Sequence, residues 1–156
     1  MNILSTQYTL NQKAYEIYLA GCNANPHCIN CHNPESWDFN NGTPWKNKID
    51  GILLKINNEN NLHMINKIWI LGGEPLDQNF WELSILLQML RLFTTKEIWL
   101  FTRYNLDEID EYTLSQCDYI KCGRYLPKLT CDNNIQYGVK IATSNQKIYK
   151  KGLDYA

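Results

Sequence analysis

The chain has 156 residues, of which 44% are hydrophobic and 20% are charged, and its formal net charge at pH 7 is −1. These values are typical of one globular domain, and they exclude the strongly basic composition of a nucleic-acid-binding protein. No apolar run reaches the roughly 18 residues that a membrane span needs, and the first fifteen residues lack the apolar segment of a secretory signal. We therefore expect a single cytoplasmic domain over residues 1–156 that binds neither nucleic acid nor membranes.

The first predicted strand covers residues 14–20, whose apolar side chains alternate along the segment. Gly21 then opens a polar loop that contains three of the six cysteines. Apolar residues at helical spacing predict a helix over residues 48–56. The polar residues 57–61 that follow are expected to form a surface loop.

A second strand is predicted at residues 67–71, where the sequence is short and almost continuously apolar. Such a run is typical of a parallel strand that is buried on both faces. The strand ends at a glycine pair. After it, apolar residues recur about every 3.6 positions, which predicts a helix over residues 77–93 with Asp77 as its N-cap.

Two further strands are predicted at residues 97–101 and 118–122, with a short acidic helix over residues 106–114 between them. The alternation of strands and helices predicts an α/β fold in which the strands are mostly parallel. Four or five such units are too few for a closed eight-stranded barrel. The sequence therefore predicts a single α/β domain built as an open or partial (β/α) barrel.

Cys22, Cys28 and Cys31 lie within ten positions of one loop, and the last two have the spacing that lets two thiolates reach one metal centre. Thiolates select zinc, copper(I) or iron–sulfur clusters over hard cations. A structural Cys3His zinc site, with His27 or His32 as the fourth ligand, is one interpretation. A disulfide within the loop is less favoured because nothing in the sequence indicates export.

The glycine pair belongs to the segment Gly72-Gly73-Glu74-Pro75, directly after the predicted strand at residues 67–71. Two glycines allow a sharp turn or a close approach of the backbone to a ligand. Ligands of parallel α/β folds bind at the carboxyl ends of the strands, so this turn and the cysteine loop should share one rim. A valine placed at Gly73 is expected to obstruct a ligand there while sparing a metal centre on the cysteines.

The two segments together resemble the pattern of radical S-adenosylmethionine enzymes. Within that superfamily the chain is similar to the activating proteins of anaerobic ribonucleoside-triphosphate reductase. The closer resemblance rests on five runs in the family's order: Cys31-His32-Asn33-Pro34-Glu35-Ser36-Trp37-Asp38, Ile70-Leu71-Gly72-Gly73-Glu74-Pro75-Leu76, Ile98-Trp99-Leu100-Phe101-Thr102-Arg103-Tyr104, Asp118-Tyr119-Ile120-Lys121-Cys122-Gly123-Arg124-Tyr125 and Ser144-Asn145-Gln146-Lys147.

The resemblance implies one [4Fe-4S] cluster on Cys22, Cys28 and Cys31, with one iron left open for S-adenosyl-L-methionine. It implies reductive cleavage of that cofactor to a 5′-deoxyadenosyl radical, which would place a glycyl radical on the large subunit of the anaerobic (class III) ribonucleotide reductase. A low-potential electron donor such as flavodoxin is implied as a second partner. The segment from Gly72 to Glu74 would bind S-adenosylmethionine, and His32 would either stack near its adenine or cap a turn.

The chain departs from the family pattern at two places. Five residues separate Cys22 from Cys28, where the family usually has three, and Arg103 stands where the family often has glycine. His27, inside the longer spacer, is expected to be solvated, whereas Trp37 is expected to pack beneath the loop. Arg103 would meet a carboxylate or form a surface ion pair.

Three alternatives remain open from the sequence. One is the activase of another glycyl-radical enzyme, and another is a small radical S-adenosylmethionine synthase. The third is a zinc-stabilised binding module without catalysis. The remaining cysteines lack a tight pair, so we expect no second cluster from them: Cys117, Cys122 and Cys131.

Overall fold

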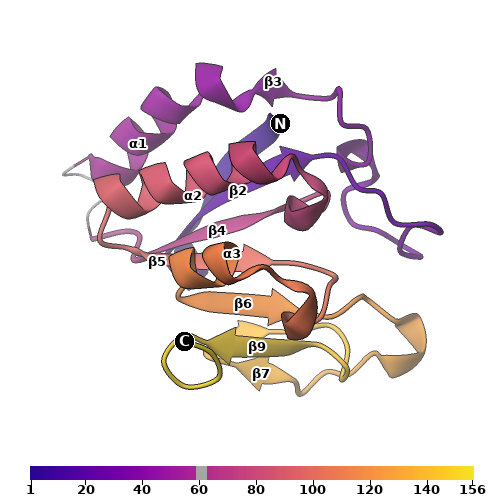
Figure 1. The fold of residues 1–156 in the computed structure, drawn as a ribbon. Coiled ribbons are helices and arrows are strands. Elements are labelled where there is room, and N and C mark those ends of the chain that lie inside the picture. Colours follow the sequence, from indigo (N-terminus) through magenta and orange to yellow (C-terminus); the bar gives the residue numbers. More distant parts are fainter. Residues whose placement is uncertain (59–62) are drawn as a thin grey trace.

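The computed structural model describes residues 1–58 and 63–156. Within these residues the main sheet has seven strands in the spatial order β3-β1-β2-β4-β5-β6-β9 (Figure 1). A separate two-stranded sheet pairs β7 with β8. The strands are β1 (Asn2–Thr9), β2 (Ala14–Ala20), β3 (Thr43–Pro44), β4 (Lys67–Gly72), β5 (Glu97–Phe101), β6 (Tyr119–Cys122), β7 (Ile135–Gln136), β8 (Val139–Lys140) and β9 (Lys147–Lys150).

The centre of the main sheet is parallel. β2 pairs with β4, β4 with β5 and β5 with β6, all in parallel register. Antiparallel strands flank this centre, with β1 and β3 on one side and β9 on the other. The predicted α/β fold with a parallel central sheet is therefore confirmed, and the sheet order shows no closure between β3 and β9 among the described residues.

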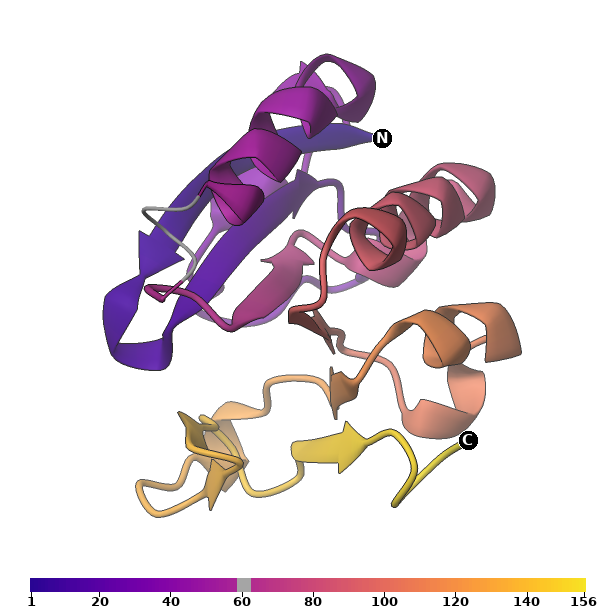
Figure 2. The same cartoon turned by 90° about the vertical axis from the view of Figure 1, so that its left-hand side faces the viewer.

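Three helices connect the parallel strands: α1 (Ile49–Asn57), α2 (Phe80–Phe93) and α3 (Glu111–Gln116). All three lie on the same face of the sheet, whereas the β7–β8 hairpin lies toward the other side (Figure 2). No helix in the described part of the chain is both long and apolar enough to cross a membrane.

Both faces of the sheet are buried, and this explains the nearly continuous apolar runs in β4 and β5. Alternate residues such as Ile68 and Ile70 pack against the helices. The residues between them face the opposite side, where Trp69 and Trp99 pack with Val139 of the hairpin. A parallel strand covered on both faces buries apolar side chains in both directions.

Two predicted helices differ from the structure. The helix predicted over residues 77–93 begins at Phe80, and the side chain of Asn79, not Asp77, accepts the capping bond from the backbone N–H of Glu82. A short 3-10 turn, Pro75–Asp77, precedes the helix, and Asp77 is the last residue of that turn. The helix predicted over residues 106–114 is divided into a 3-10 turn (Leu106–Glu108) and α3.

The remaining differences lie at the edges of the sheet. The edge strands β1, β3 and β9 and the β7–β8 hairpin were absent from the prediction, because their polar or short segments carry little apolar alternation. Of the surface loop predicted over residues 57–61, Asn57 belongs to α1, and residues 59–62 lie outside the described residues.

Candidate functional site

The sequence-predicted residues meet in one pocket at the carboxyl ends of the parallel strands. This pocket has a volume of about 180 Å³, and Cys22, Cys28 and Cys31 all line it together with the segment from Gly72 to Glu74. A neighbouring pocket of about 380 Å³ shares Cys28, Cys31 and Gly72 and also includes His32. The two loops that follow β2 and β4 therefore share a rim, as the topology predicts.

Backbone hydrogen bonds fix the start of the cysteine loop at the end of β2. The N–H of Gly21 donates to the carbonyl oxygen of Ser36 over 2.7 Å, and the N–H of Cys22 donates to that of Trp37 over 3.1 Å. The N–H of Cys31 donates to the carbonyl oxygen of Cys28, which closes the tight turn between these two cysteines. The loop thus returns alongside its own beginning before the chain continues to β3.

The three cysteines are free and half-buried. Burial raises the pKa of the Cys22 thiol, and the carboxylates of Asp77 and Glu74 raise it further, whereas a hydrogen bond from the backbone of Ala24 lowers it. The positive charge of Arg103 also lowers the pKa of Cys22. A metal centre bound at this thiol would favour the thiolate in the same way.

The sequence left two kinds of metal centre open for these cysteines, a single zinc ion and an iron–sulfur cluster. Among the described residues no three Cys, His, Asp or Glu side chains are gathered closely enough to hold a single ion. Cys22, Cys28 and Cys31 instead line one cavity. A cubane cluster presents separate iron corners, so thiolates arranged around a cavity fit it better than they fit one tetrahedral ion with ligands at about 2.3 Å.

His27 is half-buried and packs against its own loop, so it is less exposed to solvent than the sequence-based expectation had it. Its ring stacks on Trp37 with 4.0 Å between ring centroids and an interplanar angle of 13°. Its Nε2 lies 3.1 Å from the carbonyl oxygen of Cys22, within hydrogen-bond distance. The longer spacer thus folds back onto its own loop. Trp37 is half-buried and lines the pocket, so it packs against His27 and is not part of the buried core that was expected beneath the loop.

The glycine turn packs directly against the start of the cysteine loop. A Cβ atom built at Gly73 would lie 2.2 Å from the carbonyl oxygen of Gly21 and 2.7 Å from that of Ser36. The N–H of Glu74 donates to the same Gly21 oxygen over 2.8 Å. This packing counts against the expectation that a side chain at Gly73 would spare the metal centre, because the first atoms it meets belong to the loop that carries the cysteines.

The carboxylate of Glu74 is buried and occupied by the protein itself. It accepts hydrogen bonds from the hydroxyl of Thr102 (2.7 Å) and from the backbone N–H groups of Leu76 (3.1 Å) and Arg103 (2.8 Å). Burial raises its pKa, and these hydrogen bonds oppose the rise. The side chain of Glu74 therefore joins the turn after β4 to the segment after β5.

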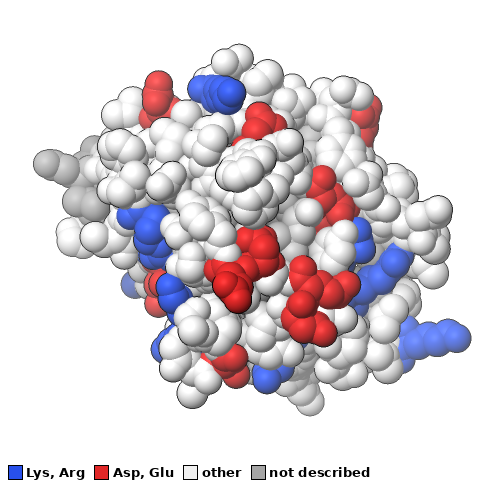
Figure 3. All heavy atoms as spheres, in the orientation of Figure 1, with Lys and Arg blue, Asp and Glu red and all other residues white. Residues whose placement is uncertain are grey.

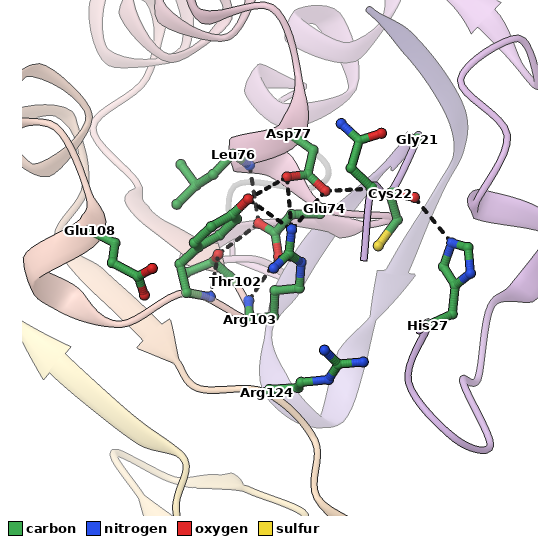
Figure 4. A network of polar contacts seen from close by, with 12 residues as sticks. Gly21, Cys22, His27, Glu74, Leu76, Asp77, Thr102, Arg103, Glu108 and Arg124 are labelled. Atoms are coloured by element: carbon green, nitrogen blue, oxygen red, sulfur yellow. Dashed lines mark hydrogen bonds and ion pairs between the residues drawn. The ribbon is translucent and has the colours of Figure 1, made fainter. Parts of the chain in front are cut away.

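Asp77 joins three strand-end segments in one network (Figure 4). Its carboxylate accepts from the backbone N–H of Asn23 over 2.6 Å and from the hydroxyl of Tyr104 over 2.6 Å. The guanidinium of Arg103 donates to both oxygens of this carboxylate, over 3.0 Å and 3.2 Å. Of the two roles left open for Arg103, the structure shows an ion pair, and this pair is largely buried rather than superficial.

Sequence reasoning missed three further residues around the pockets. Burial lowers the pKa of Lys121 to about 8, opposed by Glu74, Cys122 and Cys28, and its Nζ donates to the carbonyl oxygen of Gly123. Gln146 donates to the same oxygen and lines both pockets. Arg124 donates to the carbonyl oxygen of Pro26 within the cysteine spacer. The resemblance marked these segments, yet no local pattern indicated their contacts.

The other cysteines lie apart from this rim chemistry. Cys117 and Cys122 are buried in the helix-side core, and burial raises the pKa of each to about 12. Cys131 is half-buried, and its backbone N–H donates to the carbonyl oxygen of Ala142. None of the three lines the two pockets.

Comparisons with known proteins found relatives that share one name. A protein from Salmonella typhimurium is 28% identical over 106 residues, which is 67% of either chain, and one from Escherichia coli K12 is 27% identical over 138 residues, or 85% of either chain. A protein from Pasteurella multocida is 26% identical over 104 residues, covering 64% of this chain and 63% of its own. Each is named anaerobic ribonucleoside-triphosphate reductase-activating protein.

No solved structure matched the chain. The family described as "4Fe-4S single cluster domain" matches it over residues 13–149, from just before β2 into β9. This span contains every residue that lines the two rim pockets, including the three cysteines and the glycine turn. The chain therefore belongs to the 4Fe-4S single cluster domain family.

Proposed function

We propose that this protein is the radical S-adenosylmethionine activase of an anaerobic ribonucleotide reductase. The observation that carries the proposal is the shared pocket, where Cys22, Cys28 and Cys31 lie beside the turn from Gly72 to Glu74. The relatives' names supply the reductase as the proposed partner. The family match supports the iron–sulfur group.

Within this proposal the thiols of Cys22, Cys28 and Cys31 hold one [4Fe-4S] cluster, and S-adenosylmethionine binds beside it. When bound, the cluster supplies the electron that splits the sulfonium of S-adenosylmethionine into methionine and a 5′-deoxyadenosyl radical. With that chemistry in place, hydrogen transfer from a backbone glycine of the reductase would leave a stored glycyl radical, with 5′-deoxyadenosine as the other product.

The chain's own residues bind and orient the cofactor. Because the Glu74 carboxylate already accepts three hydrogen bonds, the turn offers its backbone, not that carboxylate, to the amino group of the cofactor. Gly72 and His32 border the larger pocket, which has room for the nucleoside end. Leu71 and Phe101 line both pockets and present apolar walls that exclude water from the radical.

The proposal also covers the organisation of the whole chain. Residues 1–156 form one radical S-adenosylmethionine domain whose open sheet is part of a (β/α) barrel, with the active rim at the carboxyl ends of β2, β4, β5 and β6. The order of the strands and the placement of the helices on one face support this description. A low-potential donor such as flavodoxin delivers the electron.

The test begins with anaerobic purification of wild type, of Cys28→Ala and of the matched control Cys131→Ala. Wild type and the control should be brown, contain about four irons and four sulfides per chain, and cleave S-adenosylmethionine with dithionite. Cys28→Ala should lose all three properties. Incubation of the wild type with the reductase large subunit should then give the electron paramagnetic resonance doublet of a glycyl radical.

Two results would contradict the proposal. A colourless protein with one zinc per chain would indicate the zinc-stabilised module. The other result is a brown protein that cleaves S-adenosylmethionine but forms the glycyl radical on a different glycyl-radical enzyme. That result would support the proposed reaction and contradict the reductase as its partner.

A further inference from the structure

A second concave surface lies on the helical side of the molecule, away from the rim pockets. It is a groove of about 430 Å³ between the first half of α2 and the start of α3. Its lining residues are Phe80, Trp81, Ser84, Ile85 and Gln88 of α2 and Tyr112 of α3. We call this surface the α2–α3 groove.

The groove exposes an unusual amount of apolar surface. Trp81 is 72% exposed, and Phe80 and Ile85 are 43% and 44% exposed. Phe80 makes edge contacts with Trp81 on one side and Tyr112 on the other, with ring centroids 5.2 Å and 6.4 Å apart. Single exposed apolar residues are ordinary, but a contiguous aromatic patch around a hollow is typical of a binding surface.

A polar group in this groove has no partner. Ser84 is 7% exposed, and its Oγ forms no hydrogen bond among the described residues. A buried hydroxyl without a partner loses its hydrogen bonds to water, so such groups usually have a ligand or an ordered water. The groove therefore offers one polar contact within an apolar surface, which suits a peptide segment with an exposed backbone or polar group.

The border of the groove is acidic. Four of the five residues from 107 to 111 are acidic (Asp107, Glu108, Asp110 and Glu111), and they immediately precede Tyr112. No Lys or Arg occurs between residues 104 and 120. Figure 3 shows acidic side chains gathered over α3 and the segment before it, beside a mostly uncharged surface. This charge favours an occupant that carries Lys or Arg next to its apolar residues.

We propose that the α2–α3 groove docks a basic, amphipathic segment of the reductase large subunit. The inference rests on the proposed function. A second copy of this chain fits less well, because a symmetric contact would bring the two acidic borders together. An anionic membrane surface would be repelled for the same reason.

The position of the groove suits this role. α2 begins three residues after Asp77, whose carboxylate lies at the rim, and α3 follows the segment that leaves β5. Both helices therefore start at the end of the sheet that carries the cysteine pocket (Figure 1). A partner anchored in the groove would be held at the end of the molecule where its glycine must enter.

The experiment measures the affinity of cluster-loaded protein for the reductase large subunit by anaerobic biolayer interferometry. Trp81→Ser removes the most exposed aromatic, and Leu92→Ser is its control, because Leu92 is 73% exposed on the same helix but outside the groove. Glu111→Lys reverses a charge in the first turn of α3. Asp50→Lys is its control, because it makes the same charge reversal in the first turn of α1 and so disturbs a helix dipole to the same extent.

We expect Trp81→Ser to weaken binding about ten-fold and Glu111→Lys about five-fold at low salt, with the second effect fading in high salt. Both controls should bind as the wild type does. All variants should cleave S-adenosylmethionine normally with dithionite in the absence of the reductase. Failure of the wild type in that uncoupled reaction would contradict the proposed function without bearing on the groove.

Three outcomes would overturn the inference about the groove. The first is unchanged affinity in both groove variants beside a wild type that binds. The second is a shift from dimer to monomer caused by Trp81→Ser in sedimentation, which would identify a second copy as the occupant. The third is co-sedimentation of the protein with phosphatidylglycerol vesicles that Trp81→Ser abolishes.

Discussion

At the scale of single residues, the rim is held together by two carboxylates that take no part in the proposed chemistry. Asp77 binds the backbone of Asn23 in the cysteine loop and the side chain of Arg103 after β5. Glu74 binds the hydroxyl of Thr102 beside that arginine. Each carboxylate thus fixes the relative positions of loops that follow different strands, and such positioning determines whether a cofactor is held precisely.

His27 gives a residue-scale prediction about the enlarged spacer. His27→Ala removes both the stack on Trp37 and the contact with the Cys22 carbonyl oxygen, whereas His27→Phe removes only the contact. We expect the cluster of His27→Ala to lose iron to a chelator about ten-fold faster than that of the wild type, with His27→Phe between them. His63→Ala, exposed and outside both rim pockets, is the control. Equal rates in all four proteins would show that His27 does not stabilise the loop.

Lys121 gives a prediction about pH. Its pKa is about 8 in the folded protein against an ordinary value of 10.5, so between these values the unfolded chain holds a proton that the folded chain has lost. Stability contributed by this residue therefore rises with pH across that window.

In urea unfolding, the wild type should gain stability relative to Lys121→Met as the pH rises from 8 to 10, by at most about 1.4 kcal/mol per unit. Because Cys and Tyr groups titrate in both proteins, only the difference between them is informative. Parallel curves would mean that Lys121 remains fully charged in the folded protein.

At the scale of elements, the turn after β4 is the contact between the cysteine loop and the sheet. Gly72 has a φ of +118°, and a Cβ there would lie 2.4 Å from the backbone of Leu19 in β2. Gly73 approaches the Gly21 and Ser36 backbones equally closely. The turn therefore needs glycine at both positions for reasons of packing, in addition to any approach of a cofactor.

Gly73→Ala should consequently disturb the cysteine loop as well as the cofactor site. We expect a lower iron content and a loss of about 2 kcal/mol or more in the free energy of unfolding, measured by urea titration of the apoprotein. Gly51→Ala is the matched control, because nothing lies within 4 Å of a Cβ at that position in α1. That control should be neutral or slightly stabilising. A Gly73→Ala protein with full iron and unchanged stability would contradict the observed packing.

At the scale of the whole molecule, the sheet separates two apolar layers, and two of the six cysteines lie in the layer on the helix side. Cys117 and Cys122 belong to the helix-side layer with Ile98 and Ile120. Their raised pKa values favour the neutral thiol, which is the form of a buried apolar side chain rather than of a metal ligand.

The triple variant Cys117→Ala, Cys122→Ala, Cys131→Ala should therefore keep about four irons per chain and cleave S-adenosylmethionine as the wild type does. It should be less stable, by about 1–2 kcal/mol for each buried sulfur removed, because alanine leaves small cavities in the core. Iron and sulfide analysis beside urea unfolding measures both effects. Loss of about half the iron would indicate a second cluster and a different branch of the superfamily.

The sequence alone determined the central strands and the set of candidate ligands. β2 and β5 have the predicted bounds, because alternating or continuous apolar residues define a buried strand locally. The spacing of the three cysteines and the glycine pair after β4 are equally local features, and the parallel topology implied that they share a rim. The resemblance added the proposed cofactors and partner, which geometry alone does not name.

The tertiary structure decided which side chains hold that rim together. Asp77 contacts Asn23 across 54 residues of sequence, and Gln146 contacts Gly123 across 23. The stack of His27 on Trp37 depends on the return of the cysteine loop, and the lowered pKa of Lys121 depends on its burial between loops. None of these contacts has a local period or spacing, so they arise only when the strands bring distant segments to the same edge of the sheet.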